Sequence, residues 1–357
     1  MKLERKILIE NQKIINEIAI DKNLSKSTIS SYKSTLKEYC MFNKMSIDEL
    51  LKEAEYEEEK GIILKKRNIK NRINSYKIYL IKQKNQPLTI NTKLAKVKSL
   101  YNFYDIEIPN IRLLKKTNHE TINDLPSKKD ILLVLQNTND IRFKTIILFL
   151  LSSGNSLNET LNITLDDFIK ATKDYHNENT LGSCLEKLDK IDVIIPTFSL
   201  YRQKTNYPYI SFCSHEATKY LIFYLKIRLS HDKNIQLTDK LFNIKYNTLQ
   251  AQFRRINDRL NFGYVGQYRF FHAHSLRKYF ATNLLKADLD PMIIDFLSGR
   301  SISKVHEAYF KADPQKLKEK YISIVNYLVI NDNYLIEEKK SKNEFDSPYM
   351  SQKEYFT

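Results

Sequence analysis

Several residue types are scarce in or absent from this sequence, and each scarcity excludes a class of structure. The 357 residues include no tryptophan and only six glycines, which favours a helix-rich chain. The three cysteines, Cys40, Cys184 and Cys213, are far apart and form no CxxC pair. A disulfide framework and a cysteine-based zinc site are therefore not expected, and a reducing, intracellular compartment fits.

Long hydrophobic runs are missing as well. The longest apolar segments, such as residues 146–151 and 322–330, are too short or too interrupted to cross a bilayer. The N-terminal residues lack the apolar core and cleavage site of a signal peptide. The sequence contains no P-loop, GxGxxG or GxSxG motif. We expect no association with membranes.

The charge of the chain is strongly unbalanced. Lysine and arginine total 58 against 42 aspartate and glutamate residues, which gives a formal net charge of +16. Such an excess favours a polyanionic partner, either nucleic acid or an anionic membrane surface. The alternative is a codon bias, because the chain is also rich in lysine, asparagine and isoleucine.

Residues 1–110 are predicted to form a helical domain of four helices. Ser25 begins a start signal for the first helix, and a second helix runs through Ser46. A third helix runs through Ile69, and Pro87 opens a fourth. Basic side chains lie beside the apolar positions of these helices, where they could meet DNA phosphates. The candidates for DNA contacts in this domain are Arg67, Lys70, Lys93 and Lys96. For each of them, the alternative is an ordinary solvated side chain.

The rest of the chain is predicted as a linker, a second domain and a tail. Residues 111–127 are polar and aperiodic, and Ser127 caps the first helix of a domain over residues 128–330. Strand character appears only at residues 191–196 and 207–213, which predicts a small hairpin with Lys204 close to its turn. Residues 331–357 form a polar tail. The fold class is therefore mainly α with a small β-sheet.

One pair of residues points to phosphate chemistry. His274 and Arg277 are three positions apart, so on a helix their side chains emerge on one face. A guanidinium can grip two phosphate oxygens, and an imidazole can exchange a proton near neutral pH. Alone, the pair is a weak signal, since a core histidine beside a surface arginine gives the same spacing.

A metal site is a weaker interpretation of the same region. His272 and His274 could be combined with Cys213 and His215 into a set of ligands. No carboxylate or cysteine pair completes that set, so no metal is expected.

Further motifs follow in a fixed order, and together they resemble the tyrosine recombinases, or phage-type integrases. The segments that carry the resemblance are 154–168, Arg202 to Lys204, His274 to Arg277, Gly299-Arg300 and Tyr309. The resemblance covers about residues 20–328 and is greatest to archaeal-type and Xer-related integrases. It implies a SAM-like four-helix core-binding domain followed by a recombinase catalytic domain.

The resemblance also implies a mechanism. Tyr309 would attack a DNA phosphodiester, forming a 3′-phosphotyrosyl link and releasing a 5′-hydroxyl. Arg277 and Arg300 would stabilise the phosphate charge, and Arg300 stands where the family usually has histidine or tryptophan. His274 would manage the tyrosine proton, and Lys204 would protonate the leaving oxygen. Neither a metal nor a nucleotide cofactor is expected.

One position departs from the family pattern. The first motif normally has an arginine where this chain has Ser156, although Glu159 stands where the family has its acidic partner. Three explanations remain open. The enzyme could be impaired, the segment could align differently, or another basic residue could reach the phosphate. The nearest candidates in the sequence are Arg142, Lys144 and Arg202.

The resemblance implies partners and a setting too. The partner would be double-stranded DNA inside the cell, at the nucleoid, and four protomers would assemble on two DNA sites. The apolar segment 321–328 resembles an element that family members dock on a neighbouring protomer. An integrase of a mobile element or virus, archaeal or viral in type, is preferred over a housekeeping resolvase. The rivals are a site-binding relative that no longer cuts and a type IB topoisomerase-like enzyme.

Overall fold

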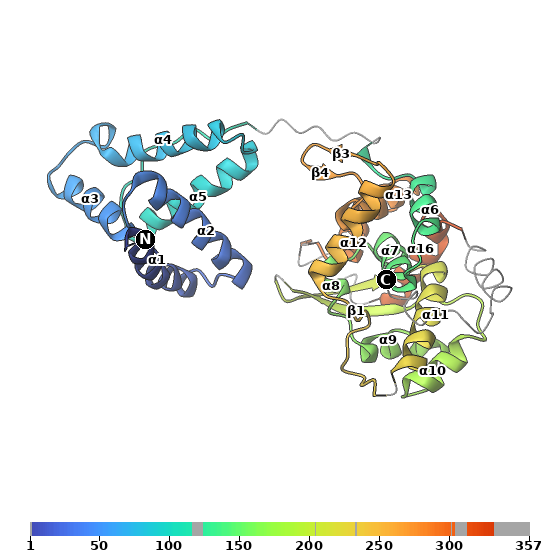
Figure 1. Cartoon of the computed structure of the whole chain (residues 1–357). Coiled ribbons are helices and arrows are strands. Elements are labelled where there is room, and N and C mark those ends of the chain that lie inside the picture. The colour runs from blue at the N-terminus through green and yellow to red at the C-terminus, as the bar shows by residue number, and fades with distance from the viewer. Residues whose placement is uncertain are drawn as a thin grey trace. The chain divides into compact units, whose positions relative to one another are not determined.

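The computed structural model describes residues 2–115, 124–203, 205–232, 234–300, 302–303 and 313–331, with side chains from residue 12 onwards. The chain divides into two compact units, residues 1–119 and 120–357 (Figure 1). Each unit has its own hydrophobic core, and the two cores share no residue. Each unit is therefore described by itself below.

The N-terminal unit is a bundle of five α-helices. They are α1 (Lys2–Asp21), α2 (Lys26–Asn43), α3 (Ile47–Glu59), α4 (Asn68–Lys82) and α5 (Pro87–Phe103), with a 3-10 turn at Leu64–Lys66. The four helices predicted from the sequence correspond to α2 to α5. The sequence prediction missed α1, which buries Ile15 and Ile18 in the same core.

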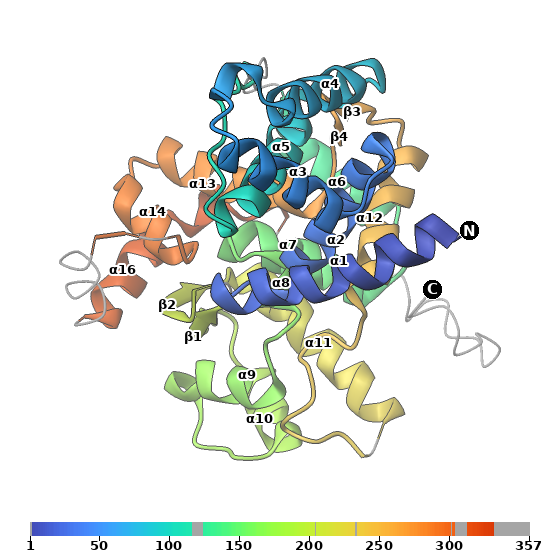
Figure 2. The ribbon, with the colours of Figure 1, turned by 90° about the vertical axis from the view of Figure 1, so that its left-hand side faces the viewer.

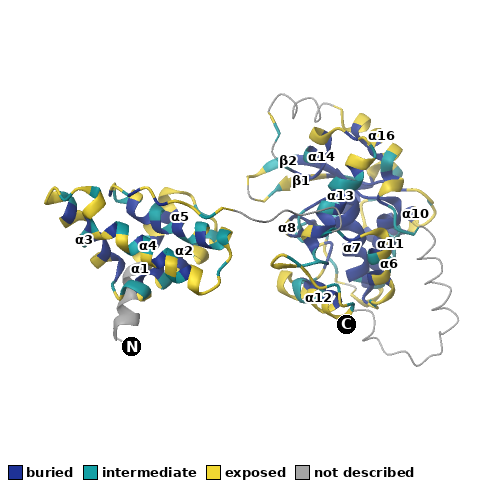
Figure 3. Ribbon diagram, turned by 90° about the horizontal axis from the view of Figure 1, so that it is seen from above, coloured by how far each residue is buried: buried dark blue, intermediate teal, exposed yellow. Residues whose placement is uncertain are grey.

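The C-terminal unit is built around a helix with almost no exposed face. This helix, α7 (Ile141–Ser153), buries every side chain except that of Arg142, and Figure 3 shows it in the buried colour. It packs against α11 (His215–His231) and α13 (Ala273–Lys286). A helix that is apolar all round can be stable only when neighbours cover all its faces.

The other helices of this unit surround that centre. They are α6 (Lys128–Gln136), α8 (Leu157–Thr160), α9 (Leu165–Ala171), α10 (Leu181–Leu188), α12 (Tyr246–Arg259), α14 (Pro291–Leu297) and α16 (Pro314–Ile324), with 3-10 turns at Lys173–Tyr175 and Val325–Tyr327. Among the described residues, no helix is long and apolar enough to cross a membrane.

A two-stranded antiparallel hairpin lies among these helices. Its strands are β1 (Thr197–Arg202) and β2 (Tyr207–Phe212), and Arg202 is paired with Tyr207 next to the turn. In Figure 2 the hairpin is seen between α14 and α16 on one side and α9 on the other, and these helices contact it. The hairpin thus connects two parts of the unit that are distant in the sequence.

One strand prediction is wrong, and one hairpin was not predicted. The predicted strand at residues 191–196 is not a strand, because the Ile195 amide donates to the Tyr175 hydroxyl instead of a strand partner. The first strand begins only after Pro196, which has no N–H to donate. A second hairpin, β3 (Tyr264–Val265) with β4 (Tyr268–Arg269), was not predicted, since two-residue strands show no alternating pattern.

The helix starts predicted at Ser25 and Ser127 are confirmed. Ser25 and Ser127 accept hydrogen bonds from the first turns of α2 and α6, and Asp313 does the same for α16. Gly154 ends α7 in the left-handed conformation, with φ of 66°. A Cβ on Gly154 would lie only 2.4 Å from the ring of Phe280, so this position requires glycine for space as well.

The end of α16 and the residues that follow it pack against the rest of the C-terminal unit. Tyr321 and Leu328 are completely buried, and the Tyr321 hydroxyl donates to the Ser152 carbonyl at 2.7 Å. The amides of Ile330 and Asn331 donate to the carboxylate of Glu216. These two side chains are therefore covered by the chain itself, whereas Ile322 and Tyr327 are exposed, and docking of this segment on a neighbour stays a prediction.

Candidate functional site

The helix α13 brings the predicted histidine and arginine to one face. His274 is exposed in its first turn, whereas Arg277 is 8% exposed because α13 packs against α7. The guanidinium of Arg277 lies 3.8 Å from the carboxylate of Glu159. The local spacing predicted that the two side chains share a face, and the fold adds a buried counter-charge.

The helix α8 shows what Ser156 does. Its hydroxyl accepts from the Glu159 amide at 3.3 Å, and the Glu159 carboxylate accepts from the Ser156 amide at 3.1 Å. This reciprocal pair is a capping box. Glu159 therefore caps α8 and faces Arg277 with the same oxygen, Oε2.

Tyr209 links three parts of the site and was missed by the sequence analysis. Its buried hydroxyl donates to the Asn155 side-chain oxygen at 3.0 Å. Its ring packs against Gly299, where a Cβ would lie only 3.0 Å from the ring and φ is 65°. Burial, and the nearby carboxylate of Glu159, raise the pKa of Tyr209 far above its ordinary value, so the hydroxyl stays protonated.

Two further arginines reach the same place from other elements. Arg202, at the end of β1, donates a hydrogen bond to the Gly299 carbonyl. Arg300 follows Gly299 directly and pairs with Asp295 at 2.9 Å, with 41% of its side chain exposed. The hairpin and the turn after α14 thus bring these two cationic groups to the same pocket.

These groups line one pocket of about 700 Å³. Its cationic lining comes from Arg202, Arg277 and Arg300, with His274 beside them, and Glu159 is its single carboxylate among the described residues. Tyr246 and Gln250, one turn apart on α12, complete its polar wall and were not predicted. Their signal in the sequence is the polar face of an amphipathic helix. An excess of fixed positive charge in a concave site suits a phosphate group.

The surroundings hold His274 in its neutral form. Although the His274 ring is open to the pocket, the protein atoms around it disfavour the charged form and lower its pKa, and the positive charges of Lys278, Arg277 and Arg300 lower it further. The pKa of Arg277 is also lowered, first by burial, while Glu159 counteracts this effect. A neutral imidazole can accept a proton, whereas the arginines remain cationic at any physiological pH.

Two of the predicted site residues lie outside the described residues. They are Lys204, which lies between β1 and β2 in the sequence, and Tyr309, which lies between Gly299 and α16 in the sequence. The described neighbours of Lys204 in the sequence, Arg202 and Gln203, both line the pocket.

The other cations proposed to replace the missing arginine lie elsewhere. Arg142 donates to the Asn243 carbonyl at 2.8 Å and pairs with Asp140. Lys144 is 3% exposed within α7. Neither residue lines the pocket.

The basic residues of the N-terminal unit differ in how accessible they are. The side chain of Arg67 is 11% exposed and binds Glu58 and the Ile62 carbonyl, which indicates a structural role. Lys93 pairs with Glu38 at 2.6 Å. Lys70 is partly exposed, and Lys96 donates to the Ser31 hydroxyl.

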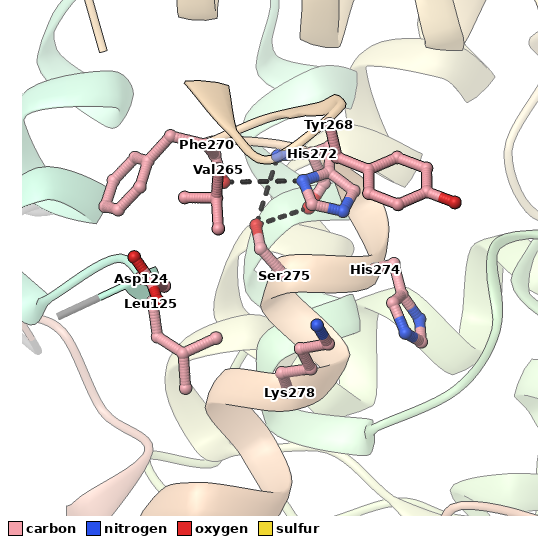
Figure 4. Close-up of a pocket in the computed structure, with 9 residues that line it drawn as sticks. All are labelled: Asp124, Leu125, Val265, Tyr268, Phe270, His272, His274, Ser275 and Lys278. Atoms are coloured by element: carbon pink, nitrogen blue, oxygen red, sulfur yellow. Dashed lines mark hydrogen bonds between the residues drawn. The ribbon is translucent and has the colours of Figure 1, made fainter. Parts of the chain in front are cut away.

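A second, smaller pocket of about 380 Å³ adjoins the first (Figure 4). His272 and His274 line both pockets, and Tyr268 stacks on His272 with ring centroids 6.0 Å apart. Ser275 bonds back to the His272 backbone and closes the first turn of α13. Cys213 is fully buried, and no group of three or more His, Cys, Asp or Glu within the described ranges is arranged to hold a metal.

Comparison with known proteins gives the family of the chain and the fold that it resembles. A family model described as the phage integrase family matches residues 112–316. No curated protein matches the sequence.

Several solved structures with a similar fold are DNA complexes. The XerH site-specific recombinase bound to a palindromic difH substrate, in a post-cleavage complex, has a TM-score of 0.52 at 17% identity, covering 83% of this chain and 80% of that chain. The integrase of the transposon Tn1549 with transposon right end DNA has a TM-score of 0.51 at 12% identity, with coverage of 85% and 98%. A lambda integrase dimer bound to a COC′ core site has a TM-score of 0.51 at 11% identity, with coverage of 87% and 95%.

Proposed function

The chain belongs to the phage integrase family, and from this premise we propose that it is a site-specific DNA recombinase that cleaves and rejoins DNA. The observation that carries the proposal is the pocket in which Arg202, Arg277 and Arg300 meet with one carboxylate. Its substrate is double-stranded DNA inside the cell, at the nucleoid. Four protomers assemble on two DNA sites, and the setting is a mobile element or virus of archaeal or viral type.

The reaction proceeds through a covalent link to Tyr309. The Tyr309 oxygen attacks the scissile phosphorus, and the bond from phosphorus to the 5′ oxygen breaks. His274, which is neutral near pH 7, takes the tyrosine proton, and Lys204 gives a proton to the leaving 5′ oxygen. Rejoining runs the same steps in reverse with a new 5′-hydroxyl, so neither a metal nor a nucleotide cofactor takes part.

The arginines of the pocket serve the transition state. Arg277 is oriented by Glu159, and Arg300 is held beside Gly299, so both guanidinium groups are in place before the phosphate arrives. Preorganised donors of this kind stabilise the negative charge on the non-bridging oxygens and commonly contribute about 100- to 1,000-fold in rate.

Trapping of the covalent link tests the proposal. The Tyr309→Phe variant is used to select a binding site from a library of random duplexes. A suicide duplex with a nick next to the cleavage position is then incubated with the wild-type protein, Tyr309→Phe and Tyr327→Phe. Tyr327 is a matched control because its side chain is exposed and it has no part in the proposed reaction. We expect a covalent complex with the wild type and with Tyr327→Phe only.

A second candidate function is favoured by Ser156. A relative that binds its site without cutting it would have no need of a phosphate-binding arginine at this position, and here the Ser156 side chain serves as a cap. Binding of the selected duplex without any covalent complex, over hours at neutral pH, would support this candidate and refute the recombinase.

A further inference from the structure

We propose that Arg202 is a third phosphate-binding guanidinium of the pocket, and that it supplies the contact which residue 156 cannot make. The inference rests on the proposed function, because it names a further catalytic residue of that reaction. It gives Arg202 a role in cleavage itself, beyond a general attraction to DNA.

The position of Arg202 carries the inference. It closes β1 at the turn and faces the pocket that Arg277 and Arg300 also line. One of its nitrogens donates to the Gly299 carbonyl, and this bond fixes the guanidinium next to the backbone of Arg300. An arginine has five N–H donors in a planar fork, so this single bond leaves others for two phosphate oxygens.

The charges of the pocket point the same way. Burial is the main cause of the lowered pKa of Arg277, and the positive charges of Arg300 and, to a smaller extent, Arg202 lower it further. Three guanidinium groups around a space with one carboxylate repel one another. A phosphate in that space would relieve the repulsion, and its charge would be shared among donors from β1, α13 and the turn after α14.

The competing residues do not fit. Ser156 offers only a hydroxyl, and that hydroxyl accepts the hydrogen bond that caps α8. Arg142 is held by Asp140 and by the Asn243 carbonyl, and Lys144 is buried in α7. Of these three candidates, Arg202 is the one that lines the pocket.

The experiment compares two suicide duplexes that differ at one atom. One has the ordinary scissile phosphodiester, and the other has a methylphosphonate in which a neutral methyl replaces a charged oxygen. An arginine that neutralises this oxygen is needed for the first duplex and dispensable for the second. Single-turnover cleavage is measured for the wild type, Arg202→Ala, Arg202→Lys and the control Arg142→Ala, with DNA affinity and circular dichroism measured for each variant.

We expect Arg202→Ala to cleave the phosphodiester about 100- to 1,000-fold more slowly than the wild type. It should cleave the methylphosphonate within a few-fold of the wild type, since the missing charge no longer matters. Arg202→Lys, which keeps the charge and loses the fork, should fall between the two. Arg142→Ala should slow neither duplex by more than a few-fold.

Two results would overturn the inference while leaving the recombinase intact. One is phosphodiester cleavage by Arg202→Ala at the wild-type rate. The other is an equal loss on both duplexes, which would indicate a structural role for Arg202. If the wild-type protein cleaves neither duplex, the proposed function fails and the inference fails with it.

Discussion

The substitution Glu159→Gln tests how the central arginine is held. Glutamine can keep the capping hydrogen bond to the Ser156 amide, because its side-chain oxygen accepts as well. It removes the negative charge that faces Arg277. The side chains of Arg277 and Glu159 are only 9% and 7% exposed, so the cation would be left in a poorly hydrated place without its counter-charge.

The cost follows from the geometry. At the separation of 3.8 Å and an effective dielectric constant of about 20, the attraction between two unit charges is about 4 kcal/mol. Breaking a buried pair by removal of one partner typically costs about 3 to 5 kcal/mol. The pair is too long for a direct hydrogen bond and the pocket opens to water, so we expect a loss of about 3 kcal/mol in the free energy of unfolding.

Urea unfolding followed by circular dichroism measures this loss, since the chain has no tryptophan to report by fluorescence. The matched control is Asp167→Asn, which alters a second capping box in the same unit, between Thr164 and Asp167. We expect the control to lose about 1 kcal/mol. A loss for Glu159→Gln no greater than for the control would refute the reasoning about the buried charge.

Inorganic sulfate gives the same prediction a second readout. An anion that binds only the folded state stabilises it, and at a given concentration a tighter-binding anion stabilises it more. In Glu159→Gln the anion would supply the counter-charge that Arg277 has lost, so sulfate should restore part of the lost stability. Equal stabilisation of the wild type and the variant by sulfate would show that the anion does not meet Arg277.

Two other predictions concern the C-terminal unit. The ring of His176 accepts the Glu178 amide through Nδ1, and burial lowers its pKa, so the folded state prefers the neutral ring. Because the folded pKa lies below the unfolded value of about 6.5, unfolding should become easier as the pH falls through 6.5, and His176→Asn should lack this component in urea titrations at pH 7.5 and 5.5. An identical pH dependence in both proteins would contradict it. The substitution Gly154→Ala should lower the free energy of unfolding by more than about 2 kcal/mol. The left-handed backbone alone costs about 1 kcal/mol, and the new Cβ would lie 2.4 Å from the ring of Phe280. Gly263 has φ of 71° and no atom within 4 Å of an added Cβ, so Gly263→Ala should show the backbone cost alone. Equal losses of unfolding free energy in the two variants would show that the contact with Phe280 costs nothing.

Local chemistry explains which features could be predicted from the sequence. Ser25 and Ser127 determine helix starts through hydrogen bonds made within one turn. His274 and Arg277 are on one helix, so their common face follows from helical geometry. These predictions needed no knowledge of the tertiary fold.

Contacts between distant residues explain most of what could not be predicted. Arg202 meets Gly299 across 97 positions, and Tyr209 meets Asn155 across 54. Nothing in the local sequence around Tyr209 distinguishes it from the chain's other 22 tyrosines. The β3–β4 hairpin was missed for a different reason, because its strands are too short to show a period of two.

Position 156 shows how the two kinds of information combine. Read against the family motif, Ser156 is a missing arginine, but the spacing of Ser156 and Glu159 is also that of a capping box, and the structure contains one. The Ser156 hydroxyl caps α8 and carries no charge, so the cationic contact to phosphate that an arginine would make here must come from another residue. Glu159 serves both parts of the site, because it completes the cap and faces Arg277. The departure from the motif therefore leaves the contact between Glu159 and Arg277 intact. Whether the protein cleaves DNA then depends on the hairpin, where Arg202 lines the pocket.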